Sequence, residues 1–217
     1  MPKKPDNRAV ENSSRDRILE AALNEFAEKG LDGARVDSIA ESAKISKQLI
    51  YYHFESKENL YVAALEAVFD HIRTAERNLD LSGLDPSAGI SRFVEFTFDY
   101  VNEHREFVQM LMNENLQKAH YLKTSNKISS MRGPLFDLLG RLIDQGVESG
   151  DIKVRPDPVA LYVTISSLCF FYSSNVHTLT VAFGIDFQSR EVRTAFRSRI
   201  VNVVLASLAS GALTDAG

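Results

Sequence analysis

Apolar residues recur at helical spacing along nearly the whole chain, and breaks in this repeat divide the sequence into separate helices. The first helix is predicted over Arg15–Lys29, and Gly30 follows it as a C-terminal stop. A second is predicted over Val36–Ala43, with its apolar face toward the first. Ser46 can then cap a third short helix that runs to Phe54. The first quarter of the chain is therefore expected to hold three short helices.

The same period continues through the rest of the chain, and several segments begin at a residue suited to an N-cap. Further helices are predicted over Ser56–Leu79, Asp85–Val101, Arg105–Leu116, Leu135–Val147, Asp157–Ala182 and Ser189–Leu208. No convincing strand pattern competes with them. The sequence predicts an all-α chain of about nine helices, in which three short helices and a connector helix precede a helical bundle.

Charge narrows the ways in which this chain can meet nucleic acid. The formal net charge is −4 and the pI is about 5.8, so a basic surface coat is excluded and any DNA contact must come from a local patch. Residues 1–57 hold ten Lys or Arg and ten Asp or Glu, which makes the segment neutral. Residues 1–14 are polar and are expected to form a flexible arm, whose basic residues can follow a DNA backbone or do nothing.

The second and third short helices, joined by a three-residue turn, have the layout of a helix-turn-helix. A helix of this width enters the major groove, where Gln48 can read a base edge and Tyr52 or a basic side chain can reach a phosphate. Lys57 lies in the first turn of the next helix, whose free N–H groups also favour a phosphate. The alternative is that Tyr51–Phe54 is core and that the charges merely solvate one face.

Several runs of the sequence, in order and in spacing, resemble the signature of the TetR family. They are Ile18–Ala22, Phe26–Gly30, Ile39–Ala40 and the stretch SKQLIYYHFESKENLY at Ser46–Tyr61. The resemblance covers roughly residues 15 to 65 and implies a homodimeric, DNA-binding transcription regulator. It implies that Lys47 and Gln48 open the recognition helix. By the family pattern, Tyr51, Tyr52, His53 and Lys57 correspond to groups that contact the DNA backbone or neighbouring bases.

Three positions depart from that family pattern. Arg35 stands where the family often has a phosphate-contacting threonine, so a longer charged contact can replace a hydroxyl one. Lys44 replaces the usual glycine of the turn, which means either a strained left-handed residue or a turn that does not need one. Leu49 stands where a small or polar residue is common, so it either touches a thymine methyl group or packs inside the motif.

The resemblance implies a helix-turn-helix domain at 15–60 and an effector-binding and dimerisation domain at 61–217. The long uncharged helix and the last helix are expected to form the dimer interface, since pairing buries apolar surface and spaces two recognition helices about one DNA turn (~34 Å) apart. The expected function is a repressor that binds a palindromic operator as a homodimer and is released by a small molecule.

Candidate effector-binding residues are polar or aromatic groups set among apolar helix positions, although a helical core uses the same residue types. They are Phe96, Tyr100, Met110, Asn113, Glu114, His120, Tyr121, Phe171, Asn175, His177 and Thr178. The effector is expected to be a modest-sized aromatic or acyl molecule with a polar or anionic group, which His177 or Asn175 would anchor.

Other function classes lack their sequence signals. The charge-free stretch Pro158–Ile185 exceeds the ~20 residues of a membrane span, but its hydroxyl and amide side chains favour a helix buried in protein. No secretory signal is present, so we expect a cytoplasmic protein. The single cysteine, Cys169, suits a core position. No catalytic, metal-ligand or nucleotide-binding motif appears, so neither an enzyme nor a cofactor is expected. A helical protein that docks a partner protein stays the alternative.

Overall fold

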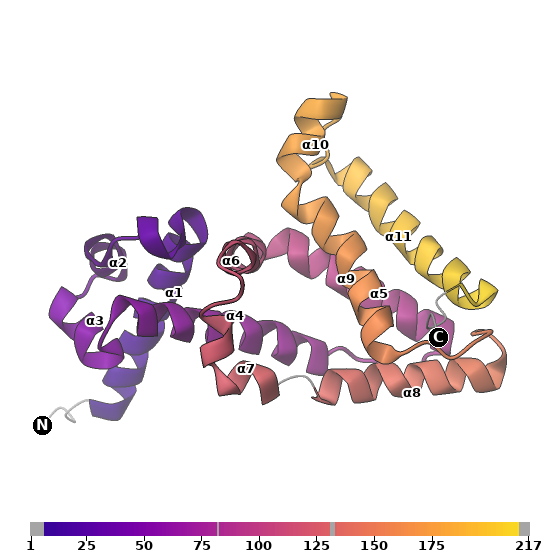
Figure 1. The fold of residues 1–217 in the computed structure, drawn as a ribbon, viewed down its shortest axis with the longest axis horizontal. Helices are drawn as coiled ribbons and strands as arrows, with labels where there is room; N and C mark the ends of the chain where they lie inside the picture. The colour runs from indigo at the N-terminus through magenta and orange to yellow at the C-terminus, as the bar shows by residue number, and fades with distance from the viewer. Residues whose placement is uncertain (1–6, 82, 131–132, 213–217) are drawn as a thin grey trace, which may run out of the picture. The chain divides into compact units, whose positions relative to one another are not determined.

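The computed structural model describes residues 7–81, 83–130 and 133–212, and these are all helical or connecting segments (Figure 1). Within these ranges the chain forms eleven α-helices and one short 3-10 helix without a strand, which confirms the all-α prediction. In chain order they are α1 (Asn7–Gly33), α2 (Val36–Ala43), α3 (Lys47–Phe54), α4 (Lys57–Arg77), α5 (Pro86–Glu103), α6 (Arg105–Leu116), η1 (Leu122–Thr124), α7 (Asn126–Ser130), α8 (Gly133–Ser149), α9 (Pro158–Ser174), α10 (Val176–Phe183) and α11 (Arg190–Ser210).

The first helix differs from its prediction at its start. It begins at Asn7, so residues 7–14 of the expected flexible arm are helical, while residues 1–6 lie outside the described residues. At Gly30 the backbone leaves the helical region with φ 65° and ψ 178°, so the predicted break is present as a kink, after which helical residues continue to Gly33. A positive φ of this size is strained for any residue with a Cβ, which explains why the helix breaks at a glycine.

The prediction of one long uncharged helix over Asp157–Ala182 is wrong. The segment forms two helices, α9 and α10, which meet at Asn175 with a bend of 64°. Within the described residues no single helix is long and apolar enough to cross a membrane. In this part of the chain, only α9 and α10 counted together, as a bent pair, reach that length and apolar composition. Helices η1 and α7 are also absent from the prediction, which raises the number above the expected nine.

The chain divides into two compact units. Unit 1 comprises residues 1–71 and 109–130, and unit 2 comprises residues 72–108 and 131–217. Unit 1 is thus larger than the helix-turn-helix domain expected at 15–60, because the end of α6 and the segment after it belong to it. The unit boundary falls within α4 and within α6, so each of these two helices contributes residues to both units.

The core of unit 1 fixes the three short helices against one another. Phe26 of α1 and Tyr61 of α4 are fully buried and meet edge to face, with ring centroids 5.0 Å apart. Ile39 of α2 and Ile50 of α3 are buried in the same cluster, and Met110 of α6 joins it. This shared core is why α2 and α3, which are too short to be stable alone, hold a defined geometry.

Unit 2 is a helical bundle in which α5 packs against α8, α9 and α11. Its buried centre includes Phe93 and Phe98 of α5, Ile165 of α9 and Val204 of α11. The predicted N-caps form at the expected places. The side chains of Asp85, Asp157 and Ser189 accept hydrogen bonds from backbone N–H groups two or three residues ahead. Cys169 is buried in this core, as predicted.

Candidate nucleic-acid interface and effector pocket

The turn between α2 and α3 is built around a left-handed residue. Lys44 ends α2 with φ 55° and ψ 50°, and its N–H donates to the Glu41 carbonyl at 3.1 Å. The N–H of Ile45 donates to the Ala40 carbonyl at 3.0 Å, which closes the end of the helix. Ser46 then starts α3, where its Oγ accepts from the Leu49 N–H at 3.3 Å. The turn therefore does adopt the left-handed conformation for which the family pattern has a glycine.

The two faces of α3 have opposite characters. Ile50 and Phe54 are buried in the core of unit 1, with exposed fractions of 1% and 5%. Lys47 and Gln48 at the start of the helix are exposed, and Tyr52 is 73% exposed. An aromatic ring held this far out of a core costs hydration free energy unless another surface covers it, so this face is suited to contact a partner.

The remaining members of the predicted interface lie around this face within unit 1. Tyr51 is exposed, whereas Leu49 and His53 are half-buried. The ring of His53 lies between the Tyr52 and Phe54 rings, with centroid distances of 5.3 and 6.1 Å, and its Nε2 is buried without a hydrogen bond partner among the described residues. His53 is therefore held mainly by contacts inside the motif.

Four basic residues lie in the helix-turn-helix or at the start of the next helix, and one of them is already paired. Lys47 Nζ lies 2.9 Å from Asp37 Oδ1 on α2, and the hydrogen bond from this ammonium raises the pKa of Lys47. Arg35, Lys44 and Lys57 have no carboxylate within ion-pair distance in the part of the chain that the structure describes. Three unpaired cations next to one exposed helix can meet phosphate oxygens without breaking an existing ion pair.

Hydrogen bonds to nearby side chains fix the backbone at two of these cations, Arg35 and Lys57. The backbone N–H of Arg35 donates to Glu25 Oε1 at 3.0 Å, and Lys29 donates to the same carboxylate. Burial acts to raise the pKa of Glu25, but these hydrogen bonds and the nearby cations hold it below its usual value. The Oγ of Ser56 accepts from the Asn59 N–H at 3.0 Å, as predicted, and so sets Lys57 in the first turn of α4.

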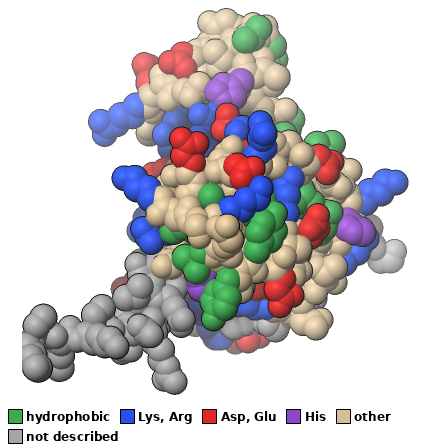
Figure 2. Space-filling model, turned by 90° about the vertical axis from the view of Figure 1, so that its left-hand side faces the viewer, with side chains coloured by type: hydrophobic (Ala, Val, Ile, Leu, Met, Phe, Trp, Pro, Cys, Tyr) green, Lys and Arg blue, Asp and Glu red, His purple; other side chains and the backbone are tan. Residues whose placement is uncertain are grey.

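The surface charge is mixed on the face that Figure 2 shows, so this face is not a basic coat. In the face shown in Figure 2, Lys and Arg side chains alternate with Asp and Glu side chains. No group of three or more His, Cys, Asp and Glu residues in the described ranges is arranged to hold a metal ion.

The structure does not bring the predicted effector residues together. Five of them, Met110, Asn113, Glu114, His120 and Tyr121, belong to unit 1. Met110 is fully buried in the core, and Asn113 Nδ2 donates to the Phe26 carbonyl at 3.2 Å. Glu114 Oε2 accepts from the Leu122 N–H at 2.9 Å, while its Oε1 is buried without a hydrogen-bond partner among the described residues.

The other six predicted effector residues lie in unit 2, on α5, α9 and α10 and at Asn175 between the last two. The Tyr100 ring is buried and lies 5.8 Å from the Phe96 ring. Asn175 donates to the Phe171 carbonyl at 3.0 Å where α9 ends, and the Thr178 hydroxyl donates to the Asn175 carbonyl at 2.9 Å. These contacts explain the polar groups as local hydrogen-bonding partners of helix ends.

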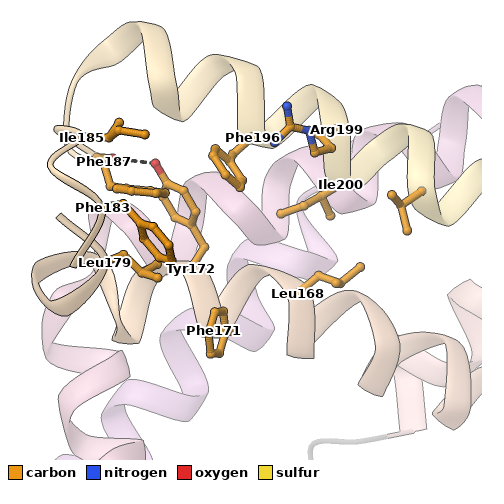
Figure 3. A pocket seen from close by; sticks show the side chains of 11 residues that line it. Leu168, Phe171, Tyr172, Leu179, Phe183, Ile185, Phe187, Phe196, Arg199 and Ile200 are labelled. Atoms are coloured by element: carbon orange, nitrogen blue, oxygen red, sulfur yellow. Dashed lines mark hydrogen bonds between the residues drawn. The ribbon is translucent and has the colours of Figure 1, made fainter.

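Unit 2 contains an apolar pocket of about 460 Å³ bounded by α9, α10 and α11 (Figure 3). Its lining residues are Leu168, Phe171, Tyr172, Leu179, Phe183, Ile185, Phe187, Phe196, Arg199, Ile200 and Val203. The Tyr172 hydroxyl donates to the Phe187 carbonyl at 2.5 Å, and Arg199 stacks on Phe196 at 4.9 Å, so the polar groups present are turned to internal partners.

Only Phe171 of the predicted effector residues lines this pocket. Sequence reasoning missed Tyr172, Phe183, Phe187 and Phe196, four aromatic residues that come from three helices and the loop between α10 and α11. The density of aromatic residues on both sides of the Gly184 turn is the signal that could have found them. A criterion of polar groups among apolar positions does not detect it.

Comparison with known proteins gives the same assignment for both halves. Residues 18–64 match the model "Bacterial regulatory proteins, tetR family", and residues 86–204 match "Tetracyclin repressor-like, C-terminal domain". The chain is 32% identical to the HTH-type transcriptional repressor NicS of Pseudomonas putida over 90% of this chain and 92% of that protein. It is 35% identical to the biofilm operon regulator IcaR of Staphylococcus aureus over 44% of this chain and 53% of IcaR.

Solved structures agree with this. A putative transcriptional regulator from Streptomyces coelicolor is 26% identical to this chain. The superposition covers 88% of this chain and 96% of that protein, with a TM-score of 0.63. A tetR-family regulatory protein from Rhodococcus is 21% identical and supports the fold. The superposition covers 90% of this chain and 96% of that protein, with a TM-score of 0.67. From the two matched domains and the full-length similarity, this chain belongs to the TetR family of DNA-binding transcriptional regulators.

Proposed function

We propose that this chain is a ligand-responsive repressor that binds a palindromic operator as a homodimer and leaves it when a small molecule binds. The observation that carries the proposal is α3, whose inward side is locked in a core while Gln48 and Tyr52 stay exposed beside three unpaired cations. The relatives named as a repressor and as a negative regulator support repression.

On the DNA, α3 would lie in the major groove with Gln48 against a base edge, where an amide pairs well with adenine. Arg35, Lys44 and Lys57 would contact phosphates, and the Tyr51 and Tyr52 hydroxyls would add hydrogen bonds to the backbone. Leu49 is half-buried, which leaves only part of its side chain for a thymine methyl group.

Lys47 has a different status, because Asp37 already neutralises it. A phosphate that approached Lys47 would meet the Asp37 carboxylate at the same place, and the two anions would repel each other. Asp37→Asn should therefore tighten binding to every DNA sequence, most clearly at low salt. This separates Lys47 from the three unpaired cations around it.

The DNA proposal is tested by selecting duplexes from a random pool and measuring affinity for the selected site. Lys57→Ala should weaken all sequences alike and lower the slope of log affinity against log salt by about one. Gln48→Ala should relax preference at particular base pairs. Lys153→Ala, which removes the same charge from unit 2, is the matched control. Failure to enrich any sequence, or wild-type binding by both interface variants, would refute the assignment.

The dimer proposal rests on apolar side chains exposed on α9, α10 and α11. Val181 is 86% exposed, Phe183 65% and Phe171 60%, and Val163 of α9 and Val203 of α11 are half-exposed. Single exposed apolar residues are common, but this many on three elements favour a second copy of the chain as their cover. A twofold pair of these faces also supplies the two recognition helices that a palindrome needs.

Sedimentation equilibrium tests the dimer. Phe171→Glu should shift the chain toward monomer, because each interface would then bury two unpaired carboxylates. Val147→Glu on α8 places the same charge on another exposed apolar position and should leave the dimer intact. A wild-type chain that sediments as a monomer contradicts the proposal, as does equal dissociation of the two variants.

The effector is proposed to bind in unit 2 and to act as a ligand that favours one of two conformations. Residues of α4 and α6 belong to both units, so a shift along either helix changes the position of the motif that reads DNA. A panel of aromatic and acyl compounds added to the operator complex should contain one that releases it. If no compound that binds the protein alters its operator affinity, the regulatory part of the proposal fails.

A further inference from the structure

A second, much smaller cavity of about 100 Å³ lies in unit 2, near the end of α5, the start of α6 and the segment between α10 and α11. Its lining residues are Asn102, Arg105, Ser173, Val176, Phe187, Gln188 and Arg193. The predicted effector residues do not include any of these, and the DNA interface lies in unit 1. Two arginines in so small a space call for a negative partner.

Neither guanidinium has a carboxylate within ion-pair distance among the residues that the structure describes. The neighbouring Arg197, one turn beyond Arg193 on α11, shows the contrast, because it lies 3.1 Å from Glu95 and 3.0 Å from Asp99. Acidic side chains on α5 thus neutralise Arg197, while the charges of the two arginines at the cavity are not neutralised by an ion pair in the described structure.

The contact that Arg105 does make is with a histidine ring. Its Nη2 lies against Nε2 of His177, and because a guanidinium stays protonated, the arginine donates and the ring nitrogen accepts. The partner of Arg105 is thus an imidazole ring and not a carboxylate, so this contact brings no negative charge to the cavity. Arg105 keeps further N–H donors for another partner.

The other polar groups of the cavity supply both donors and acceptors but no charge. Asn102 uses one amide hydrogen for the Phe98 carbonyl at 2.7 Å and keeps the second. Ser173 gives its hydroxyl hydrogen to the Val101 carbonyl at 2.7 Å, so it has only lone pairs left for the cavity. In the loop before Gln188, the Asp186 carboxylate accepts from the backbone N–H of Gln188 at 2.9 Å and does not line the cavity.

We propose that this cavity is an anion site, which binds a carboxylate or a small oxyanion between Arg105 and Arg193. The planar fork of a guanidinium matches two anion oxygens, and an anion held between two such forks removes their mutual repulsion. The lining also includes two buried apolar residues, Val176 and Phe187, whereas Arg105 and Gln188 are exposed, so an anion can reach the cavity from solvent. The volume is enough for a carboxylate or a tetrahedral oxyanion, since a water molecule takes up about 30 Å³ in the liquid.

The anion can be a free ion or the head group of an organic molecule. Phe187 also lines the apolar pocket described above, so this residue borders both the polar and the apolar cavity. The proposal goes beyond the repressor function and needs neither DNA nor an effector. It therefore stands or falls separately from the operator assignment.

Calorimetric titration of the full chain without DNA tests the anion site. Sodium sulfate, sodium acetate and sodium benzoate are titrated at an ionic strength held constant with chloride, against the wild type and single variants. Arg193→Gln and Arg105→Gln should each lower the affinity about tenfold or more, since each removes a charge-assisted hydrogen bond. Arg190→Gln removes the same charge from the first turn of α11, outside the lining, and should bind as the wild type does.

The pattern of responses decides the proposal. Saturable binding of at least one anion that is lost in both lining variants and kept in Arg190→Gln supports the site. Tighter binding of benzoate than of acetate then identifies the head group of an organic molecule, and equal binding identifies a free ion. Absence of saturable binding by the folded wild type overturns the proposal, and so does an equal response of all four proteins.

Discussion

Replacing Lys44 with glycine should stabilise unit 1 and weaken DNA binding at the same time. Lys44 ends α2 in the left-handed region, at φ 55° and ψ 50°. An L-residue in this region costs about 1–2 kcal/mol relative to glycine, because Cβ approaches the following carbonyl oxygen. The greater freedom of glycine in the unfolded chain returns about 0.5–1 kcal/mol of that difference. The net gain in unfolding free energy for Lys44→Gly is therefore about 1 kcal/mol.

Lys44→Ala is the matched control, because it removes the charge but keeps the left-handed cost. Since Lys44 is exposed and has no ion pair in the described structure, this variant should unfold at nearly the wild-type free energy. If Lys44 contacts a phosphate, both variants should lose affinity equally and lower the salt slope by about one.

Two measurements at fixed protein concentration separate these effects. Hydrogen exchange of amides in residues 36–54 reports the stability of the helix-turn-helix, and fluorescence anisotropy with a labelled operator reports affinity. Equal protection of the glycine and alanine variants would show that the turn relaxes away from the left-handed conformation, which refutes the strain argument. Wild-type DNA affinity in both variants would remove Lys44 from the interface.

Three further predictions concern unit 2. Arg73 and Glu76 are buried, and their charged atoms lie 2.5 Å apart. Glu76→Leu should therefore lower the free energy of unfolding, measured in urea, by about 3–5 kcal/mol, whereas the double variant Arg73→Met/Glu76→Leu should lower it much less. Additive losses in the two single variants would contradict this. A Cβ at Gly146 would lie 2.6 Å from Cδ1 of Ile152, so Gly146→Ala should cost about 1–3 kcal/mol, and Ile152→Ala should abolish that increment in a double-mutant cycle. Burial raises the pKa of the Cys169 thiol to about 12, so iodoacetamide should label it at pH 8 only after unfolding; fast labelling of the folded chain would refute its buried position.

The features that sequence predicts well depend on residues close together in the chain. Ser46 and Ser56 cap their helices because each hydroxyl needs only an N–H three residues ahead. The buried face of α3 follows from the spacing of Ile50 and Phe54 against a helical period. Such constraints act over one or two helical turns, so the order of residues alone is enough to locate the helix-turn-helix.

The bend at Asn175 shows what the local signals lack. No proline or glycine interrupts the charge-free run there, and Asn175 takes a backbone conformation of φ −108° and ψ 6° that many residues tolerate. The Ser173 hydroxyl donates to the Val101 carbonyl of α5, and Tyr172 is tied to the Phe187 carbonyl after the bend. The break is thus accompanied by contacts with distant segments, and the spacing of apolar residues along the sequence cannot predict such contacts.

The scatter of the predicted effector residues has the same physical origin. A polar or aromatic side chain on an apolar helix face can anchor a ligand or satisfy a neighbouring backbone group, and the sequence does not distinguish the two. Asn113 and Glu114 satisfy the backbone in unit 1, on the Phe26 carbonyl and the Leu122 N–H. Arg105 and Arg193, by contrast, lie 88 positions apart in the sequence. They can be recognised as a candidate site only because the fold places both at one cavity whose lining contains no Asp or Glu. A binding site in such a bundle is therefore recognised by which polar groups stay unsatisfied after folding.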